Sequence, residues 1–194
     1  LYNAAGPGQS LEEDVRAAVN GIAKPTDIKV LVSLSCTMCP ELVTAAQRIA
    51  EQALTEILPL IKPGAVEREL AAELDYRMAR LGSTGVSFPT IFVSGAKSSL
   101  PHGTPGDKKI EAGDFVTIDF GAMVGGYHSD MTRTFAVGFA TDEMKKVYNT
   151  VLEAQLAGLA ATKAGVAGKD IDGAARKVIT DAGYGEFFGH GYGH

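Results

Sequence analysis

The sequence has no tryptophan and only two cysteines, Cys36 and Cys39, among its 194 residues. Two cysteines exclude a structural zinc site with four cysteine ligands. No apolar run approaches the roughly 18 residues that indicate a membrane-spanning helix, and no signal-peptide pattern occurs, so we expect a cytoplasmic protein without a membrane partner. The net charge of −5 gives no electrostatic reason to bind nucleic acid, and we expect no such partner.

Helical and strand-like patterns occur together, which predicts a fold of the α/β (α+β) class. Helices are expected at 40–62, 66–81, 141–162 and 168–182, and strands at 87–94, 114–124 and 127–138. The few predicted strands leave a sheet with an open edge, which favours a homo-oligomer.

Gly125-Gly126 predicts the turn of a β-hairpin, because both central residues of a type I′ turn need a positive φ angle. The flanking segments 115–124 and 127–137 alternate in hydrophobicity, as half-buried strands do. Centring the turn on the two glycines pairs residues whose numbers sum to 251. The register of the hairpin is therefore predicted residue by residue.

Two aspartates, Asp119 and Asp130, are the most informative residues of this hairpin. In the predicted register Asp119 lies opposite Thr132, and Asp130 lies opposite Gly121. Both carboxylates then share one face as diagonal neighbours, about 7–8 Å apart at the backbone, and Gly121 leaves space between them. Two carboxylates this close repel each other unless a cation neutralises them, so the pair suggests a metal site. The alternative is that both aspartates face solvent and have no function.

Three further features favour the functional interpretation of the aspartates. Their face of the hairpin is small and polar, and two histidines, His190 and His194, follow later in the chain. The opposite face of the first strand is an ordinary core face, made of Val116, Ile118, Phe120 and Ala122.

Several motifs in order resemble the catalytic domain of the pita-bread metallopeptidases, the family of methionine aminopeptidase, Xaa-Pro aminopeptidase and prolidase. The motifs are Ser99-Leu-Pro-His102-Gly103, Ile110 to Ala122, Gly126 to Thr134 and Phe187 to His194, with the helical segments Ala46 to Gly64 and Glu69 to Arg77. The resemblance covers about residues 45–194 and favours the prolidase or Xaa-Pro type. It implies a partial pita-bread fold, with an antiparallel hairpin and flanking helices.

The resemblance also implies a role for each matching residue. Asp119, Asp130 and His194 match metal ligands, and His102 and His190 match catalytic histidines that contact the substrate. The implied cofactor is a divalent metal, which manganese, cobalt, zinc or iron would provide. The implied reaction is hydrolysis of an N-terminal peptide bond, in which a water held by two metal ions attacks the scissile carbonyl.

The sequence departs from this family after the histidine motif. The family has two glutamate ligands beyond that motif, and the sequence has no residues there. We therefore expect an incomplete and inactive peptidase site in these 194 residues. We also expect the glycine-rich tail 184–194 to lack fixed structure, which would leave His194 poorly placed for a metal.

The N-terminal part suggests a different chemistry. A predicted strand at 28–35 leads into Cys36-Thr-Met-Cys39 at the start of a helix, which is the layout of a thioredoxin-like redox site. The amide groups of a helix N-terminus lower the pKa of a cysteine thiol, which favours a reactive Cys36.

Residues 1–48 resemble the N-terminal thioredoxin-like domain of the alkyl hydroperoxide reductase flavoprotein subunit, with Cys36 and Cys39 as the redox pair. We therefore predict two domains, 1–44 and 45–194. The two likenesses meet in one helix, which suggests a chimera of two proteins. The alternatives to a peptidase are thus a thiol–disulfide module and a composite chain with no activity.

Overall fold

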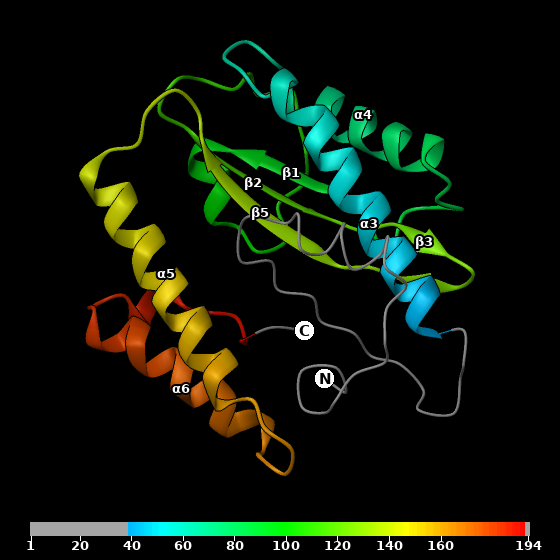
Figure 1. Cartoon of the computed structure of the whole chain (residues 1–194). Helices are drawn as coiled ribbons and strands as arrows, with labels where there is room; N and C mark the ends of the chain where they lie inside the picture. Colours follow the sequence, from blue (N-terminus) through cyan, green and yellow to red (C-terminus); the bar gives the residue numbers. More distant parts are fainter. Residues whose placement is uncertain (1–38, 193–194) are drawn as a thin grey trace. The chain divides into compact units, whose positions relative to one another are not determined.

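The computed structural model describes residues 39–192, which divide into two compact units with the boundary after Phe139 (Figure 1). Both helices and strands are present, as the sequence predicted. The first unit contains, in chain order, α3 (Cys39–Ile57), the 3-10 helix η1 (Leu58–Leu60), α4 (Glu67–Arg80), β1 (Ile91–Ser94), the 3-10 helix η2 (Gly95–Ser99), β2 (Phe115–Phe120), β3 (Met123–Val124), β4 (Tyr127–His128) and β5 (Met131–Ala136).

The strands of the first unit form two antiparallel sheets with the predicted register. The larger sheet has the order β1-β2-β5, and the smaller one pairs β3 with β4. Asp119 pairs with Thr132, and Met123 pairs with His128. The sum of 251 therefore holds in both sheets, and the predicted register is confirmed. Both turn glycines have positive φ angles, 57° at Gly125 and 82° at Gly126.

The prediction of two continuous hairpin strands was wrong, because Ser129 interrupts the ladder. The Ser129 N–H donates to the Ala122 carbonyl at 2.9 Å, but the Ala122 N–H donates to the Ser129 hydroxyl at 2.9 Å. A side chain thus replaces the backbone acceptor of the ladder. The Ser129 carbonyl oxygen instead lies 1.9 Å from where a Cβ atom on Gly121 would be. Gly121 therefore makes room for this backbone and not for a gap between the aspartates.

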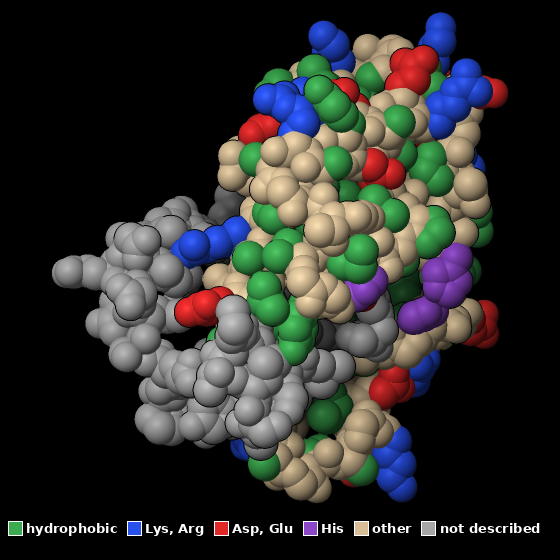
Figure 2. Space-filling view, turned by 90° about the vertical axis from the view of Figure 1, so that its right-hand side faces the viewer, with side chains coloured by type: hydrophobic (Ala, Val, Ile, Leu, Met, Phe, Trp, Pro, Cys, Tyr) green, Lys and Arg blue, Asp and Glu red, His purple; other side chains and the backbone are tan. Residues whose placement is uncertain are grey.

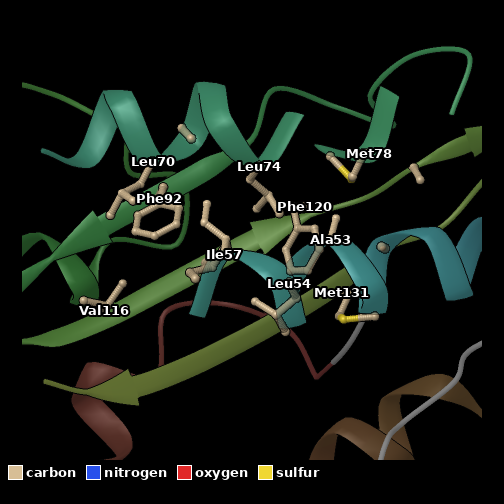
Figure 3. Close-up of a cluster of buried hydrophobic side chains, with 14 of the residues drawn as sticks. Ala53, Leu54, Ile57, Leu70, Leu74, Met78, Phe92, Val116, Phe120 and Met131 are labelled. Atoms are coloured by element: carbon tan, nitrogen blue, oxygen red, sulfur yellow. The ribbon is translucent and has the colours of Figure 1, made fainter. Parts of the chain in front are cut away.

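The core of the first unit lies between one face of the larger sheet and the helices α3 and α4 (Figure 1). Val116, Ile118 and Phe120 of β2 are fully buried there, which confirms the predicted core face. Figure 3 shows how the helices fill this layer from the other side. The labelled side chains are Ala53, Leu54 and Ile57 from α3, Leu70, Leu74 and Met78 from α4, and Phe92, Val116, Phe120 and Met131 from the strands.

Two element ends differ from the predicted ones. The α-helix α3 ends at Ile57 and not near residue 62. Pro59, in the first turn of the 3-10 helix η1, has no N–H to continue the α-helical hydrogen bonds. Strand β1 begins at Ile91 and not at residue 87. The preceding segment does not extend the ladder of β1 but bonds in a shifted register to the residues after β2. Val86 forms an isolated bridge with Ala122, and the Ser87 N–H donates to the Gly121 carbonyl at 2.9 Å.

The second unit is a helical hairpin with a short tail. It contains α5 (Asp142–Ala161), α6 (Gly168–Asp181) and the 3-10 helix η3 (Gly185–Phe187). Thr141 caps α5 by accepting a hydrogen bond from the Met144 N–H at 3.2 Å, which agrees with the predicted helix start. None of the helices within residues 39–192 has the length and apolarity that crossing a membrane requires.

The tail of the second unit is held in place up to Tyr192, so the expectation of an unstructured tail was wrong for residues 184–192. The Arg176 guanidinium donates to the carbonyls of Phe188 and His190, each at 2.9 Å. Asp172 accepts the Tyr192 N–H at 2.8 Å. The Tyr192 ring lies against Gly158, where a Cβ atom would be 2.3 Å from it. Side chains of α6 and the surface of α5 therefore hold this tail.

Candidate metal and peptide site

Asp119 lies in the middle strand of the larger sheet, on the face away from the helices. Its neighbours Ile118 and Phe120 point into the core, so the alternation of the strand turns Asp119 outwards. The side chain is half-buried. The Thr132 hydroxyl, directly across the ladder, donates to the Asp119 carboxylate at 2.9 Å. This hydrogen bond orients the carboxylate.

Asp130 lies on the same face as Asp119. Its neighbours Ser129 and Met131 are buried on the core side, where the Ser129 hydroxyl reaches the Ala46 carbonyl of α3 at 3.3 Å. Asp130 therefore points the other way, and its side chain is exposed. The register that pairs Phe120 with Met131 sets Asp130 opposite Gly121 at the next position. The two carboxylates are thus diagonal neighbours on one face, as the sequence predicted.

The segment that carries His102 crosses this same face of the sheet. Val93 pairs with Thr117 and so lies on the aspartate face, yet it is fully buried. Gly103 covers it, because a Cβ atom on Gly103 would lie 2.9 Å from the Val93 side chain. The Thr117 hydroxyl also donates to the Ser98 carbonyl at 3.4 Å. His102 itself is exposed, and histidine side chains reach the surface on the face drawn in Figure 2.

Glu67 is a fully buried carboxylate that the sequence analysis missed. It occupies the first position of α4 and accepts four hydrogen bonds. One oxygen accepts the N–H and the hydroxyl of Ser94, both at 2.8 Å, and the other accepts the Gly106 N–H at 3.0 Å and the Lys97 ammonium. Burial raises the pKa of Glu67, but these hydrogen bonds outweigh it and hold the pKa below that of an ordinary glutamate.

His190 lies in the tail of the second unit, and its side chain is exposed. Its carbonyl accepts a hydrogen bond from Arg176, and its ring Nδ1 lies 3.2 Å from the Gly191 carbonyl. His194, the third predicted ligand, is outside the described residues. So is Cys36, while Cys39 is the first residue of α3. The structure therefore describes only some of the predicted metal ligands and one cysteine of the predicted redox pair.

The donors on the aspartate face suit a divalent cation. Two carboxylates on one face, one of them already oriented by a threonine, provide the oxygen ligands that hard divalent ions prefer. Within residues 39–192 no three histidine, cysteine or acidic side chains come together as a metal site. Asp119 and Asp130 thus fit a metal as part of a ligand set and do not form a complete one among these residues.

The comparison with protein families matches residues 41–194 to metallopeptidase family M24. The uncharacterized peptidase YqhT of Bacillus subtilis is 48% identical over 149 residues, which are 77% of this chain and 42% of that protein. The Xaa-Pro dipeptidase of Pyrococcus horikoshii is 42% identical over 154 residues, 79% of this chain and 44% of that protein. The chain therefore spans about half the length of the curated relatives it matches.

The fold gives the same assignment. The solved structure of the Xaa-Pro dipeptidase from Bacillus anthracis superposes with a TM-score of 0.79 at 48% identity, over 82% of this chain and 45% of that one. This likeness agrees with the predicted partial pita-bread fold. The family match begins at residue 41, so the thioredoxin-like segment and the chimeric origin stay predictions. On the matched residues, the chain belongs to metallopeptidase family M24.

Proposed function

We propose that this chain contributes part of the catalytic centre of a cytoplasmic, metal-dependent Xaa-Pro dipeptidase or aminopeptidase. The observation that supports it most is the register of the hairpin, which sets Asp119 and Asp130 on one exposed face. The relatives named Xaa-Pro dipeptidase support a peptide substrate of this class. The chain covers about half of those relatives, so the proposal concerns the residues that it contains.

Asp119 and Asp130 would hold a divalent cation, which manganese, cobalt, zinc or iron would provide. When bound, such a cation supplies Lewis-acid activation of a peptide carbonyl and of the attacking water. Thr132 orients the Asp119 carboxylate through its hydrogen bond. His102, exposed on the segment that crosses this face, would exchange a proton with the substrate. His190 and His194 would serve as substrate contact and third ligand.

Binding of Mn²⁺ by isothermal titration calorimetry tests this proposal without requiring turnover. We expect Asp119→Asn and Asp130→Asn each to weaken Mn²⁺ binding by about tenfold or more, because each substitution removes one anionic ligand. Asp107→Asn is the matched control, since Asp107 is an exposed aspartate of the same unit that pairs with Arg68. Equal Mn²⁺ affinity in all four proteins would contradict the proposed site.

The thiol–disulfide alternative stays a separate prediction. It rests on the spacing of Cys36 and Cys39 and on a predicted helix start, and Cys36 lies outside the described residues. Alkylation with and without reductant, followed by mass measurement, would detect the predicted disulfide. A chain with two freely alkylated cysteines under oxidising conditions would count against it.

A further inference from the structure

We propose that Glu67 is a positioning residue that holds the segment 94–106, and with it His102, over the aspartate face of the sheet. The role of His102 in this inference rests on the proposed function. The placement of the segment rests on contacts within the first unit alone. Glu67 precedes the metal-site motifs in the sequence, and those motifs assign it no role.

The carboxylate of Glu67 joins both ends of this segment. Ser94, the last residue of β1, donates its N–H and hydroxyl to one oxygen, and Gly106 donates its N–H to the other. The twelve peptide bonds between Ser94 and Gly106 therefore form a loop that is closed at a single side chain. His102 lies inside that loop.

Lys97 strengthens this closure from within the loop. Its ammonium donates to the Glu67 carboxylate and also to the Thr104 carbonyl at 3.3 Å. A Cβ atom on Gly106 would lie 3.2 Å from the Lys97 nitrogen, so the ammonium lies close against this end of the loop. The backbone of α4 holds the same region, since the Arg68 N–H donates to the Gly106 carbonyl at 3.1 Å.

A purely structural role would be served more simply by an apolar residue. Burying a carboxylate costs free energy unless it is fully hydrogen-bonded, and replacing a buried ion pair by apolar groups is often neutral or stabilising. The partners of Glu67 are concentrated on one loop and the adjoining strand end, and not spread over the core. This concentration of partners indicates that Glu67 fixes the position of the loop.

Hydrogen exchange on the full chain tests this inference. In Glu67→Gln, which keeps the size of the side chain and removes its charge, we expect amides of residues 95–106 to exchange about tenfold faster or more, because hydrogen bonds to a charged group are lost. Amides of β2 and α3 should keep their wild-type protection. Glu69→Gln is the matched control, since Glu69 is exposed in the same first turn of α4.

The NMR signal of the His102 ring gives a readout that stability alone would not change. We expect it to shift or broaden in Glu67→Gln and to stay unchanged in Glu69→Gln. Equal acceleration of exchange in the loop and in β2, or an unchanged His102 signal, would overturn the inference. Should Glu67→Gln fail to fold, Ser94→Ala removes one of the four donors and is expected to loosen the same residues.

Added Mn²⁺ separates this inference from the proposed function. A nearby paramagnetic ion would broaden the His102 signal in the wild type, and less so in Glu67→Gln. If Mn²⁺ changes neither protein, the proposed metal site fails while the exchange result still decides the role of Glu67.

Discussion

At the scale of single residues, Gly121 decides whether the aspartates align. The Ser129 carbonyl occupies the place where a side chain on residue 121 would begin. This carbonyl is backbone and cannot rotate away as the end of a flexible side chain can. Any larger residue must therefore shift one hairpin strand against the other, and such a shift moves Asp130 relative to Asp119.

Gly121→Ala is accordingly expected to destabilise the first unit by about 1–3 kcal/mol, the usual cost of overpacking a closely packed site. The free energy of unfolding, from urea titration followed by circular dichroism, measures this cost. Gly173→Ala is the control, because Gly173 lies in α6 with open space around it and a helical alanine is favoured by up to about 1 kcal/mol. A Gly121→Ala protein as stable as the wild type would show that the hairpin can relax around the added methyl group.

The sequence indicated the aspartate pair but not Glu67, and the reason is physical. The hairpin register follows from local features, namely two turn glycines and a period-two pattern between residues 115 and 137. The partners of Glu67 lie 27 to 39 positions further along the chain. A glutamate in the first turn of a helix is also common, since it interacts favourably with the helix dipole. No local pattern therefore distinguished Glu67 from its exposed neighbour Glu69.

At the scale of elements, α4 carries two acids whose pKa values move in opposite directions. The pKa of Glu67 is lowered, because its hydrogen bonds outweigh the effect of burial. The pKa of Asp75 is raised by burial, although the Thr90 hydroxyl donates to it at 2.5 Å. Lys97 is the charged group that faces Glu67.

The two acids therefore predict opposite dependences of stability on pH. The stabilisation from ionised Glu67 is present above the pKa of an unfolded glutamate and is lost as the pH falls through the lowered value. The contribution of protonated Asp75 is present below the pKa of an unfolded aspartate and is lost as the pH rises through the raised value. Compared with the wild type, Glu67→Gln should thus be least stable near neutral pH, and Asp75→Asn should gain stability as the pH rises.

Urea titrations of the wild type and both variants between pH 3 and pH 7 would measure these trends, at about half-unit steps that resolve shifts of about one pKa unit. Parallel curves for the two variants would contradict the assignment. The comparison is internal, because both acids lie on one helix and both substitutions remove one negative charge.

The tail of the second unit shows why an element can be mispredicted when its partners are distant. Its glycines suggested a segment without structure in the absence of a following strand. Arg176 and Asp172 of α6 instead satisfy the tail's backbone groups, and the hydrogen bond from Arg176 lowers the pKa of Asp172. The Tyr192 ring packs against Gly158 of α5, where a larger residue would clash with it. Sequence patterns identified both helices, but not the contacts that they offer to the tail.

At the scale of the whole molecule, the described residues include open sheet edges and an exposed apolar helix face. Strands β1 and β5 lie at the two edges of the larger sheet, and β5 borders a hollow of about 200 Å³ lined by Leu58, Ile61 and residues 135–138. In the second unit, α5 exposes a row of apolar side chains, made of Tyr148, Val151, Leu152, Leu156 and Leu159. Exposed strand edges and exposed apolar patches both favour association.

The open edge predicts that the 194-residue chain associates with itself in solution. Ala136→Lys tests the β5 edge, because Ala136 is exposed at the end of that strand and an inserted lysine disfavours pairing of strand edges. We expect the wild type to elute as a dimer or larger species and Ala136→Lys as a monomer, with the mass measured by light scattering. Ala72→Lys, at an exposed position of α4, adds the same charge away from the edge and should leave the mass unchanged.

A monomeric wild type would refute self-association altogether. An Ala136→Lys protein that stays associated would exclude β5 as the contact and leave the β1 edge and the apolar row of α5 as the surfaces to substitute next.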